Sequence, residues 1–310
     1  MASFSIVSDA ACDLGSELRA RFGVDALIYS DVLYPDGHSE TVDPDWKNTT
    51  PEAYYGAMVD KKQMFKSSAP GPENVKIVFR KELDKGNDVL CITLSGGMSA
   101  IFDQCSVAAK ELKEEYPART VIVIDSRRYS TAIALPCICA SECRKAGKNV
   151  EETAAIVREY LGTIHQSGWI DDLFFLARAG RLSKGTAIMG TMIGVKPIAE
   201  FNEETGMFQV IGKARGTTRA MQANVAYVKA MIEKPEEQIV FVVNSYRKEL
   251  AEQFAEMIRA EIKPKEVIVN PIGQNCGANI GPGLVAVFFG GKKLSAGLAD
   301  ETAALAAILK

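Results

Sequence analysis

Short apolar runs alternate with amphipathic segments along the first half of the chain, a pattern typical of layered α/β structure with a mainly parallel sheet. The run at residues 88–94 is almost entirely apolar, as expected of a strand that is buried on both faces. Strands are predicted at 4–7, 26–34, 88–94 and 120–124. Helices are predicted near 15–22, 99–115, 129–146 and 151–165, and two more begin at Pro51 and Pro72.

The same layering continues beyond Gly168, where we place a domain boundary. Strands are predicted at 169–174, 195–200, 207–211, 238–244, 266–269 and 284–289. Helices are predicted at 182–193, 217–232, 248–261 and after Asp300. The sequence therefore predicts an α/β protein with two α/β domains, at 1–167 and 168–310.

Two segments read as polar loops, at 66–71 and 275–283, because serine, amide, proline and glycine residues gather there. The second lies within residues 267–291, an uncharged stretch long enough to cross a bilayer. Prolines, amides and glycines interrupt that stretch, so it predicts a strand, a loop and a strand. We expect no integral membrane segment.

Charge and cysteine content narrow the function classes. The 36 Lys and Arg residues nearly balance the 39 Asp and Glu residues, so the chain lacks the net positive charge of a nucleic-acid binder. Residues 1–14 have no basic region and include Asp9 and Asp13, which argues against a secretory signal. The seven cysteines lie mostly in apolar runs, as expected of reduced thiols. These features predict a cytoplasmic protein that does not bind nucleic acid.

The usual catalytic signatures are missing. The two histidines are His38, in a turn, and His165, at a predicted helix end, and neither lies near a nucleophile motif. The chain has no P-loop, and no Gly-x-Gly-x-x-Gly follows the first strand. The cysteines at 137–143 lack a histidine partner and read as small core residues, and the acidic pair at 171–172 reads as capping or solvated. We expect no metal site.

Hydroxyl and glycine residues follow several predicted strands, where α/β sheets place their ligands. The Ser-Gly-Gly at 95–97 precedes a helix, so its N–H groups would converge at the positive end of the helix dipole. Ser67 and Ser68 add hydroxyl donors, and residues 275–283 add amides and glycines. Together they suit a carboxylate or a phosphate, although each alone also fits a capped helix or a plain turn.

In this order, the motifs resemble those of the DegV family, fatty-acid-binding proteins that serve as the acyl-carrying subunit of bacterial fatty acid kinase. The strongest match is Ile-Asp-Asp-Leu-x₂-Leu-x-Arg-Ala-Gly-Arg-Leu at 170–182. The opening loop at 8–14 is similar to the family's Asp-Ser-Thr/Ser-x-Asp-Leu, and 95–102 to its Ser-Ser-x-Leu-Ser-Gly-Thr-Tyr. Further matching segments lie at 66–71, 125–130, 194–198, 213–216 and 277–283.

The resemblance implies a non-catalytic two-domain protein that holds one long-chain fatty acid between its domains, with the carboxylate at the serine loops. It requires no cofactor. Asn279 stands where the family usually has histidine, and an amide there donates to a carboxylate but does not titrate. The ligand-binding residues that the resemblance predicts are Ser67, Ser68, Ser95, Gly96, Asn279 and Gly281.

Residues 187–195 are small, apolar and methionine-bearing, so they are able to line an acyl tunnel, although the same composition fits an ordinary core. The predicted tunnel residues are Ile188, Met189, Met192 and Ile193. Between 177 and 220 there are seven basic residues against three acidic ones, either a solvated face or a docking patch. The predicted docking residues are Arg178, Arg181 and Lys184.

These observations favour a fatty-acid carrier that presents the bound carboxylate to an ATP-dependent fatty acid kinase. Two alternatives remain. One is a stand-alone phosphotransferase or hydrolase acting on a small carboxylate, with Asp9, Asp125 or Asp171 as the base. The other is a regulatory protein with an altered pocket. Turnover by the isolated protein would support the enzyme. An apolar pocket that holds no ligand would support the regulatory protein.

Overall fold

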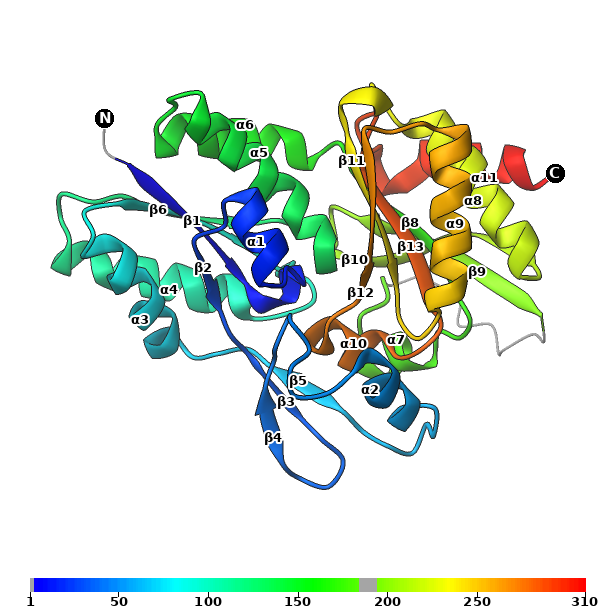
Figure 1. The fold of residues 1–310 in the computed structure, drawn as a ribbon, viewed down its shortest axis with the longest axis horizontal. Coiled ribbons are helices and arrows are strands. Elements are labelled where there is room, and N and C mark those ends of the chain that lie inside the picture. Colours follow the sequence, from blue (N-terminus) through cyan, green and yellow to red (C-terminus); the bar gives the residue numbers. More distant parts are fainter. Residues whose placement is uncertain (1–2, 184–193) are drawn as a thin grey trace. The chain divides into compact units, whose positions relative to one another are not determined.

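A computed structural model of the chain describes residues 3–183 and 194–310 (Figure 1). The chain folds into two compact units. Unit 1 comprises Met1–Asn48, Phe65–Leu161 and Gly273–Cys276, and unit 2 comprises Thr49–Met64, Gly162–Ile272 and Gly277–Lys310. The domains predicted at 1–167 and 168–310 stay a prediction. They differ from these units because the main division lies at Gly162, and because two short segments, 49–64 and 273–276, pack with the opposite half of the chain.

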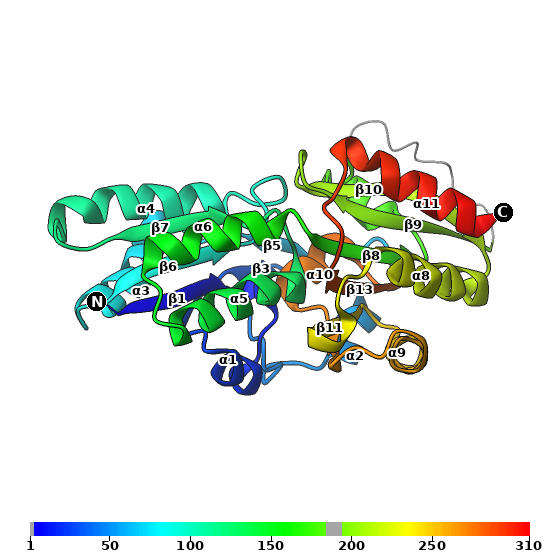
Figure 2. The same ribbon diagram turned by 90° about the horizontal axis from the view of Figure 1, so that it is seen from above.

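Unit 1 is built on a four-stranded parallel sheet in the order β2-β1-β6-β7. The strands are β1 (Phe4–Asp9), β2 (Ala26–Ile28), β6 (Asp88–Thr93) and β7 (Val121–Asp125). Helices α3 (Pro72–Leu83) and α4 (Ile101–Glu115) pack together on one face. Helices α1 (Ser16–Phe22), α5 (Ala134–Lys145) and α6 (Val150–Leu161) lie on the other, as Figures 1 and 2 show. The parallel sheet confirms the prediction for the first half of the chain.

A small antiparallel sheet in the order β4-β3-β5 also belongs to unit 1. Its strands are β3 (Asp31–Leu33), β4 (Ser39–Thr41) and β5 (Lys66–Ser68). Two predictions were wrong here. The single strand expected at 26–34 is divided between two sheets as β2 and β3, and the loop expected at 66–71 begins as β5. Strands of three residues leave too little alternation for a sequence pattern to separate.

Unit 2 contains a six-stranded mixed sheet in the order β10-β9-β8-β13-β11-β12, in which only β11 and β12 are parallel neighbours. The strands are β8 (Ile164–Ile170), β9 (Val195–Asn202), β10 (Met207–Arg215), β11 (Ile239–Asn244), β12 (Glu266–Pro271) and β13 (Leu284–Gly290). Helices α8 (Thr217–Met231), α9 (Lys248–Glu261) and α11 (Ala299–Leu309) cover it around a core in which Trp169 meets Phe254 edge to face. The α/β class is confirmed for both units.

Three shorter helices complete the picture, namely α2 (Pro51–Ala57), α7 (Phe174–Ala179) and α10 (Gln274–Ile280). The Thr50 hydroxyl caps α2 by accepting the Ala53 N–H, as the Thr-Pro start predicts. The loop expected at 275–283 was wrong, because its first part is α10. Single helical turns made by Ala10–Cys12 (η1), Ser130–Ile133 (η2), Pro235–Glu237 (η3) and Ala296–Leu298 (η4) link other elements.

Two further boundaries differ from the prediction. His165 lies inside strand β8 and not at a helix end, and Phe174 begins helix α7 instead of ending a strand. The helix expected at 182–193 falls outside the described residues from 184 onward. In the described part of the chain, no helix is both long and apolar enough to cross a bilayer.

Candidate functional site

The four parallel strands of unit 1 end at one edge of their sheet, at Asp9, Ile28, Thr93 and Asp125. From β1 the chain passes to β2 on one side, whereas β6 and β7 lie on the other side of β1. The strand order therefore reverses between β1 and β6, and a crevice at such a reversal is the usual ligand position in parallel α/β sheets. Topology alone places a candidate site beside Asp9 and Leu94.

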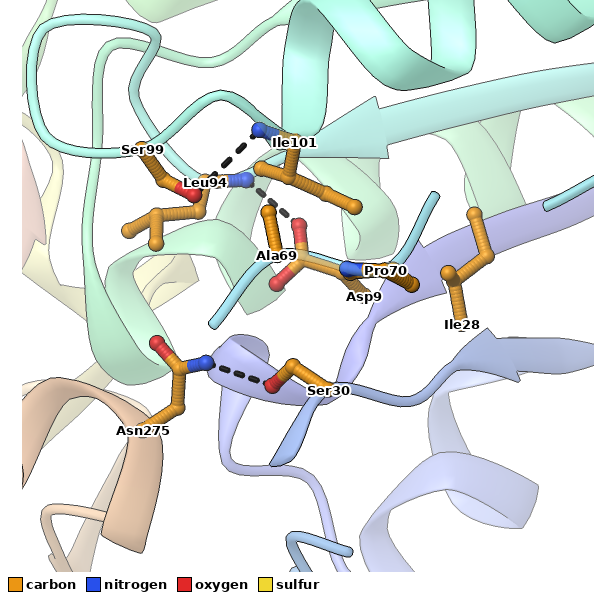
Figure 3. Close-up of a pocket in the computed structure, with 9 residues that line it drawn as sticks. All are labelled: Asp9, Ile28, Ser30, Ala69, Pro70, Leu94, Ser99, Ile101 and Asn275. Atoms are coloured by element: carbon orange, nitrogen blue, oxygen red, sulfur yellow. Dashed lines mark hydrogen bonds between the residues drawn. The ribbon is translucent and has the colours of Figure 1, made fainter. Parts of the chain in front are cut away.

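A pocket lies at this reversal point (Figure 3), and all of its lining residues belong to unit 1. Its cavity volume is about 10 Å³, which is room for about one water-sized group. The pocket therefore accommodates a head-group atom and not an acyl chain. It is lined by Asp9, Ile28, Ser30, Ala69, Pro70, Leu94, Ser99, Ile101 and Asn275.

Asp9 joins the ends of β1 and β6 at the base of the pocket. One carboxylate oxygen accepts the Leu94 N–H at 2.6 Å, and the other accepts the Ala11 N–H at 2.9 Å, which caps the turn Ala10–Cys12. The side chain is almost fully buried. Burial raises the pKa of Asp9 to about 6, although the two N–H donors oppose the shift.

Ser30, Ser99 and Asn275 supply the other polar groups. The amide of Asn275, on α10, donates to the hydroxyl of Ser30, which lies just beyond β2 (Figure 3). The hydroxyl of Ser99 accepts the Ile101 N–H at 3.2 Å at the start of α4. A hydroxyl that accepts in this way keeps its own proton for donation. The pocket thus combines a carboxyl acceptor with hydroxyl donors.

A second buried carboxyl, Asp13, lies on the same turn but does not line the pocket. Ser130 donates its hydroxyl proton to Asp13. Gly273 approaches so closely that a Cβ there would lie 2.1 Å from the Asp13 carboxylate, so the position requires glycine. Burial raises the pKa of Asp13 to about 7, whereas hydrogen bonds from Gly273 and Ser130 lower it.

Ser95 and Gly96 lie between β6 and α4 and take part in the turn itself. The Ser95 side chain is buried and its oxygen accepts the Gly97 N–H at 3.2 Å. The Gly96 N–H donates to Asp125 at 3.0 Å, and Asp125 also pairs with Arg127 at 2.8 Å. In this conformation the Gly96 N–H is directed to the chain's own carboxylate.

Ser67 and Ser68 lie in β5, directly before the pocket residues Ala69 and Pro70. Ser67 is half-buried opposite Val32, and the exposed Ser68 donates weakly to the Asp31 carbonyl at 3.4 Å. Both serines are therefore close in sequence to pocket residues, but neither lines the pocket.

Asn279 and Gly281 belong to unit 2. Asn279 is half-buried in α10. Gly281 has a φ of 72°, and a Cβ at this position would meet the Phe175 ring at 2.2 Å. Close packing on Phe175 therefore accounts for glycine at 281.

Arg178 and Arg181, the predicted docking residues, flank the end of α7 in unit 2. Arg178 stacks on Phe174 and Phe175 with its guanidinium carbon 5.1 and 4.9 Å from the ring centres, and it donates to the Lys61 carbonyl at 3.0 Å. Arg181 donates to the Ala179 carbonyl. Lys184 and the predicted tunnel residues Ile188, Met189, Met192 and Ile193 lie outside the described residues.

The sequence proposed Asp9 as the base of an alternative enzyme, Ser99 only as part of the 95–102 motif and Asn275 only as the start of the amide-bearing segment 275–283, and it did not select Ser30. Two signals were present: Ser30 lies shortly after an apolar run, and Ser99 completes the Ser-Gly-Gly-x-Ser segment. Ser30 lies in the link between β2 and β3 and Asn275 lies on α10, and neither that division of the strand nor the helix was predicted. Within the described residues, no cluster of three or more metal-ligating side chains occurs.

Comparison with known proteins identifies the family. The model of the family described as "Uncharacterised protein, DegV family" matches residues 3–292. The chain belongs to the DegV family. A DegV domain-containing protein from Clostridium perfringens is 27% identical over 291 residues, covering 93% of this chain and 98% of the relative.

Solved DegV structures share the fold. A DegV family protein from Thermus thermophilus, whose fatty acid binding is described, is 25% identical with a TM-score of 0.82, covering 92% of this chain and 98% of that one. A DegV family protein from Ruminococcus gnavus, whose structure contains vaccenic acid, has a TM-score of 0.82 at 20% identity, covering 93% and 100% of the two chains. The predicted family and fold are confirmed.

Proposed function

We propose that this protein is a cytoplasmic carrier that binds one long-chain fatty acid and presents its carboxyl group to an ATP-dependent kinase. The observation that carries the proposal is the DegV match over nearly the whole chain, together with the Thermus relative that binds fatty acid. The pocket of unit 1 supports it, since its hydroxyl groups are able to donate hydrogen bonds to an oxygen of a carboxyl group.

In this proposal, the carboxyl group lies at the pocket, where Ser30, Ser99 and Asn275 orient it. The sequence-predicted residues Ser67, Ser68, Ser95, Gly96, Asn279 and Gly281 do not line this pocket, and their contacts with the head group stay a separate prediction. The acyl chain is assigned to Ile188, Met189, Met192 and Ile193. Burying roughly fifteen methylenes at about 0.8 kcal/mol each contributes a gross 12 kcal/mol or so, before ordering costs of several kcal/mol. Affinity then comes from the tail and orientation from the head group.

Mass spectrometry of the purified protein, both native and after organic extraction, tests fatty-acid binding. We expect a lipid in about equal amount with the protein. A protein that is empty and also fails to take up added fatty acids would refute the carrier function and favour a small-carboxylate enzyme or a regulatory role.

The kinase step is assigned to the partner, because phosphoryl transfer needs a bound nucleotide and this chain has no P-loop. Arg178, Arg181 and Lys184 are proposed to contact that partner. Arg178 is unsuitable as a first test because it packs on two aromatic rings. Arg181→Glu and Lys184→Glu are better variants, and Lys234→Glu, an exposed lysine outside the basic run, is the matched control.

We expect the variants at 181 and 184 to bind fatty acid normally but to slow acyl-phosphate formation by a bacterial fatty acid kinase, with Lys234→Glu unchanged. Normal rates in all three variants would show that the basic residues are only a solvated surface.

A further inference from the structure

The wall of the unit 1 pocket carries a carboxyl group where a site for an anionic head group would be expected to carry a cation. Asp9 projects into the pocket between Leu94 and Asn275 (Figure 3). Each of its oxygens already accepts one N–H, from Leu94 and from Ala11. A carboxylate has about four acceptor positions and no donor, so the remaining capacity of Asp9 accepts hydrogen from whatever enters the pocket.

No positively charged side chain of the described residues interacts with the Asp9 carboxyl. Burial dominates the rise of its pKa, and only backbone N–H groups oppose that rise. The titratable groups of the described residues that interact with Asp9 are one carboxyl and four thiols. They are Asp13 and Cys12 on the following turn, Cys91 on β6, Cys137 on α5 and Cys276 on α10. Burial raises the pKa of each thiol, so the thiols stay neutral, and the set contains no cation.

A fatty acid bound as its carboxylate would place a second negative charge against this buried carboxyl. Two carboxyl groups in direct contact in a dry site do not both ionise, because the repulsion between the two charges exceeds the cost of holding a proton. A neutral carboxylic acid is complementary to the hydrogen-bonding groups of the pocket. Its O–H donates to Asp9, and its carbonyl oxygen accepts from hydroxyls such as that of Ser99.

We propose that Asp9 selects a hydrogen-donating head group, so that the carboxyl of the fatty acid and the carboxyl of Asp9 hold one proton between them. Binding then takes up one proton from water at neutral and alkaline pH. This inference rests on the proposed function and specifies the state in which its ligand is bound. Asp9 is a specificity-determining residue in this view, since it accepts acids and alcohols and rejects esters.

The direction in which the affinity changes with pH follows from the ionisation of the unbound fatty acid and of Asp9 in the unliganded protein. Above about pH 7 both the free fatty acid and Asp9 are ionised, so the complex gains about one proton and the affinity falls about tenfold per pH unit. Below about pH 5 Asp9 is already protonated in the free protein, so the uptake declines. A site that binds carboxylate shows neither effect.

Calorimetric titration of delipidated protein with dodecanoic acid at about pH 8, in two buffers of different ionisation enthalpy, counts the protons directly. We expect an uptake of about one proton per ligand. Binding without proton uptake would overturn this inference and leave the carrier function intact. Absence of binding at every pH would overturn the carrier function itself.

Two comparisons tie the proton to Asp9. Asp9→Asn is expected to bind without proton uptake and with an affinity independent of pH, whereas Asp13→Asn, which changes the buried carboxyl outside the pocket, keeps the uptake. The second comparison needs no variant. Dodecanol, which donates an O–H, is expected to bind the natural chain at least tenfold more tightly than methyl dodecanoate, which does not. Equal affinity for the alcohol and the ester would refute the role of Asp9.

Discussion

Asp9 in unit 1 and Asp171 in unit 2 both lie at the carboxyl end of a strand, Asp9 as the last residue of β1 and Asp171 directly after β8. They differ in burial and in the groups that they contact. Asp171, which follows β8, pairs with Lys196 at 2.6 Å and with Arg247 at 2.8 Å, and all three side chains are partly exposed. Asp9 is buried and contacts N–H groups instead of cations. A carboxylate between two cations holds elements together, whereas one without a cation stays open to a ligand that donates hydrogen.

The comparison also bears on the alternative of an enzyme with an aspartate base. Asp171 and Asp125 are both bound to cations of their own unit, Asp125 through Arg127. A base must be able to contact its substrate, and both of these carboxylates already contact basic side chains. Of the three candidates, Asp9 lines the unit 1 pocket, and Asp125 and Asp171 do not line that pocket.

The largest expected effect concerns Asp13, the neighbour of Asp9. Its pKa rises from 3.8 to about 7 on folding, so the folded chain binds more protons than the unfolded chain between these values. Relative to Asp13→Asn, the natural chain should therefore lose roughly 4 kcal/mol of unfolding free energy as the pH rises from about 4 to about 7.

Urea titrations of both proteins across that pH range measure the difference. If the difference in unfolding free energy between the two proteins did not change with pH, Asp13 would titrate alike in the folded and unfolded chains. Burial near Asp9 would then not raise the pKa of a carboxyl that lacks a cation.

Alanine in place of each strand-end aspartate gives the next effect. Asp9→Ala leaves the buried N–H groups of Leu94 and Ala11 without their acceptor and should lower the unfolding free energy by about 3 kcal/mol. Asp171→Ala leaves Lys196 and Arg247 side by side and should cost about 2 kcal/mol at low salt.

Salt separates the two losses. At about 1 M NaCl the loss in Asp171→Ala should shrink, because charges that are partly exposed are screened. The loss in Asp9→Ala should stay the same, because unsatisfied N–H groups carry no net charge. Equal salt dependence of the two variants would contradict the comparison.

The smallest expected effect concerns two serines after β6. Ser99 lines the pocket, so Ser99→Ala should weaken fatty-acid binding by about 1 kcal/mol and leave the stability nearly unchanged. Ser95 is buried and accepts the Gly97 N–H, so Ser95→Ala should reduce both binding and stability, the latter by about 1 kcal/mol. Thermal unfolding and lipid titration of each variant provide the readouts, and a Ser99→Ala variant with full affinity would move the head group away from the pocket.

The sequence alone was sufficient for the fold class, most elements and the family. Buried parallel strands such as Asp88–Thr93 appear as apolar runs, and Thr50 with Pro51 marks a helix start through local hydrogen bonding and the fixed φ of proline. Each of these signals depends on neighbours in sequence, so no tertiary knowledge is needed. The Asp-Asp-Leu-x₂-Leu-x-Arg-Ala-Gly-Arg segment added the family by resemblance, and the match over residues 3–292 confirmed it.

Only the tertiary structure decided which groups meet at the pocket and in what electrical state. Asn275 reaches Ser30 across more than two hundred residues of sequence, and Asp9 reaches the N–H of Leu94 from a different strand. The Gly96 N–H, which the sequence assigned to a ligand, donates to Asp125 instead. Asp9 and Asp171 are the same residue type, and they differ because the fold buries one carboxyl and brings two cations beside the other, neither of which is encoded at the residue itself.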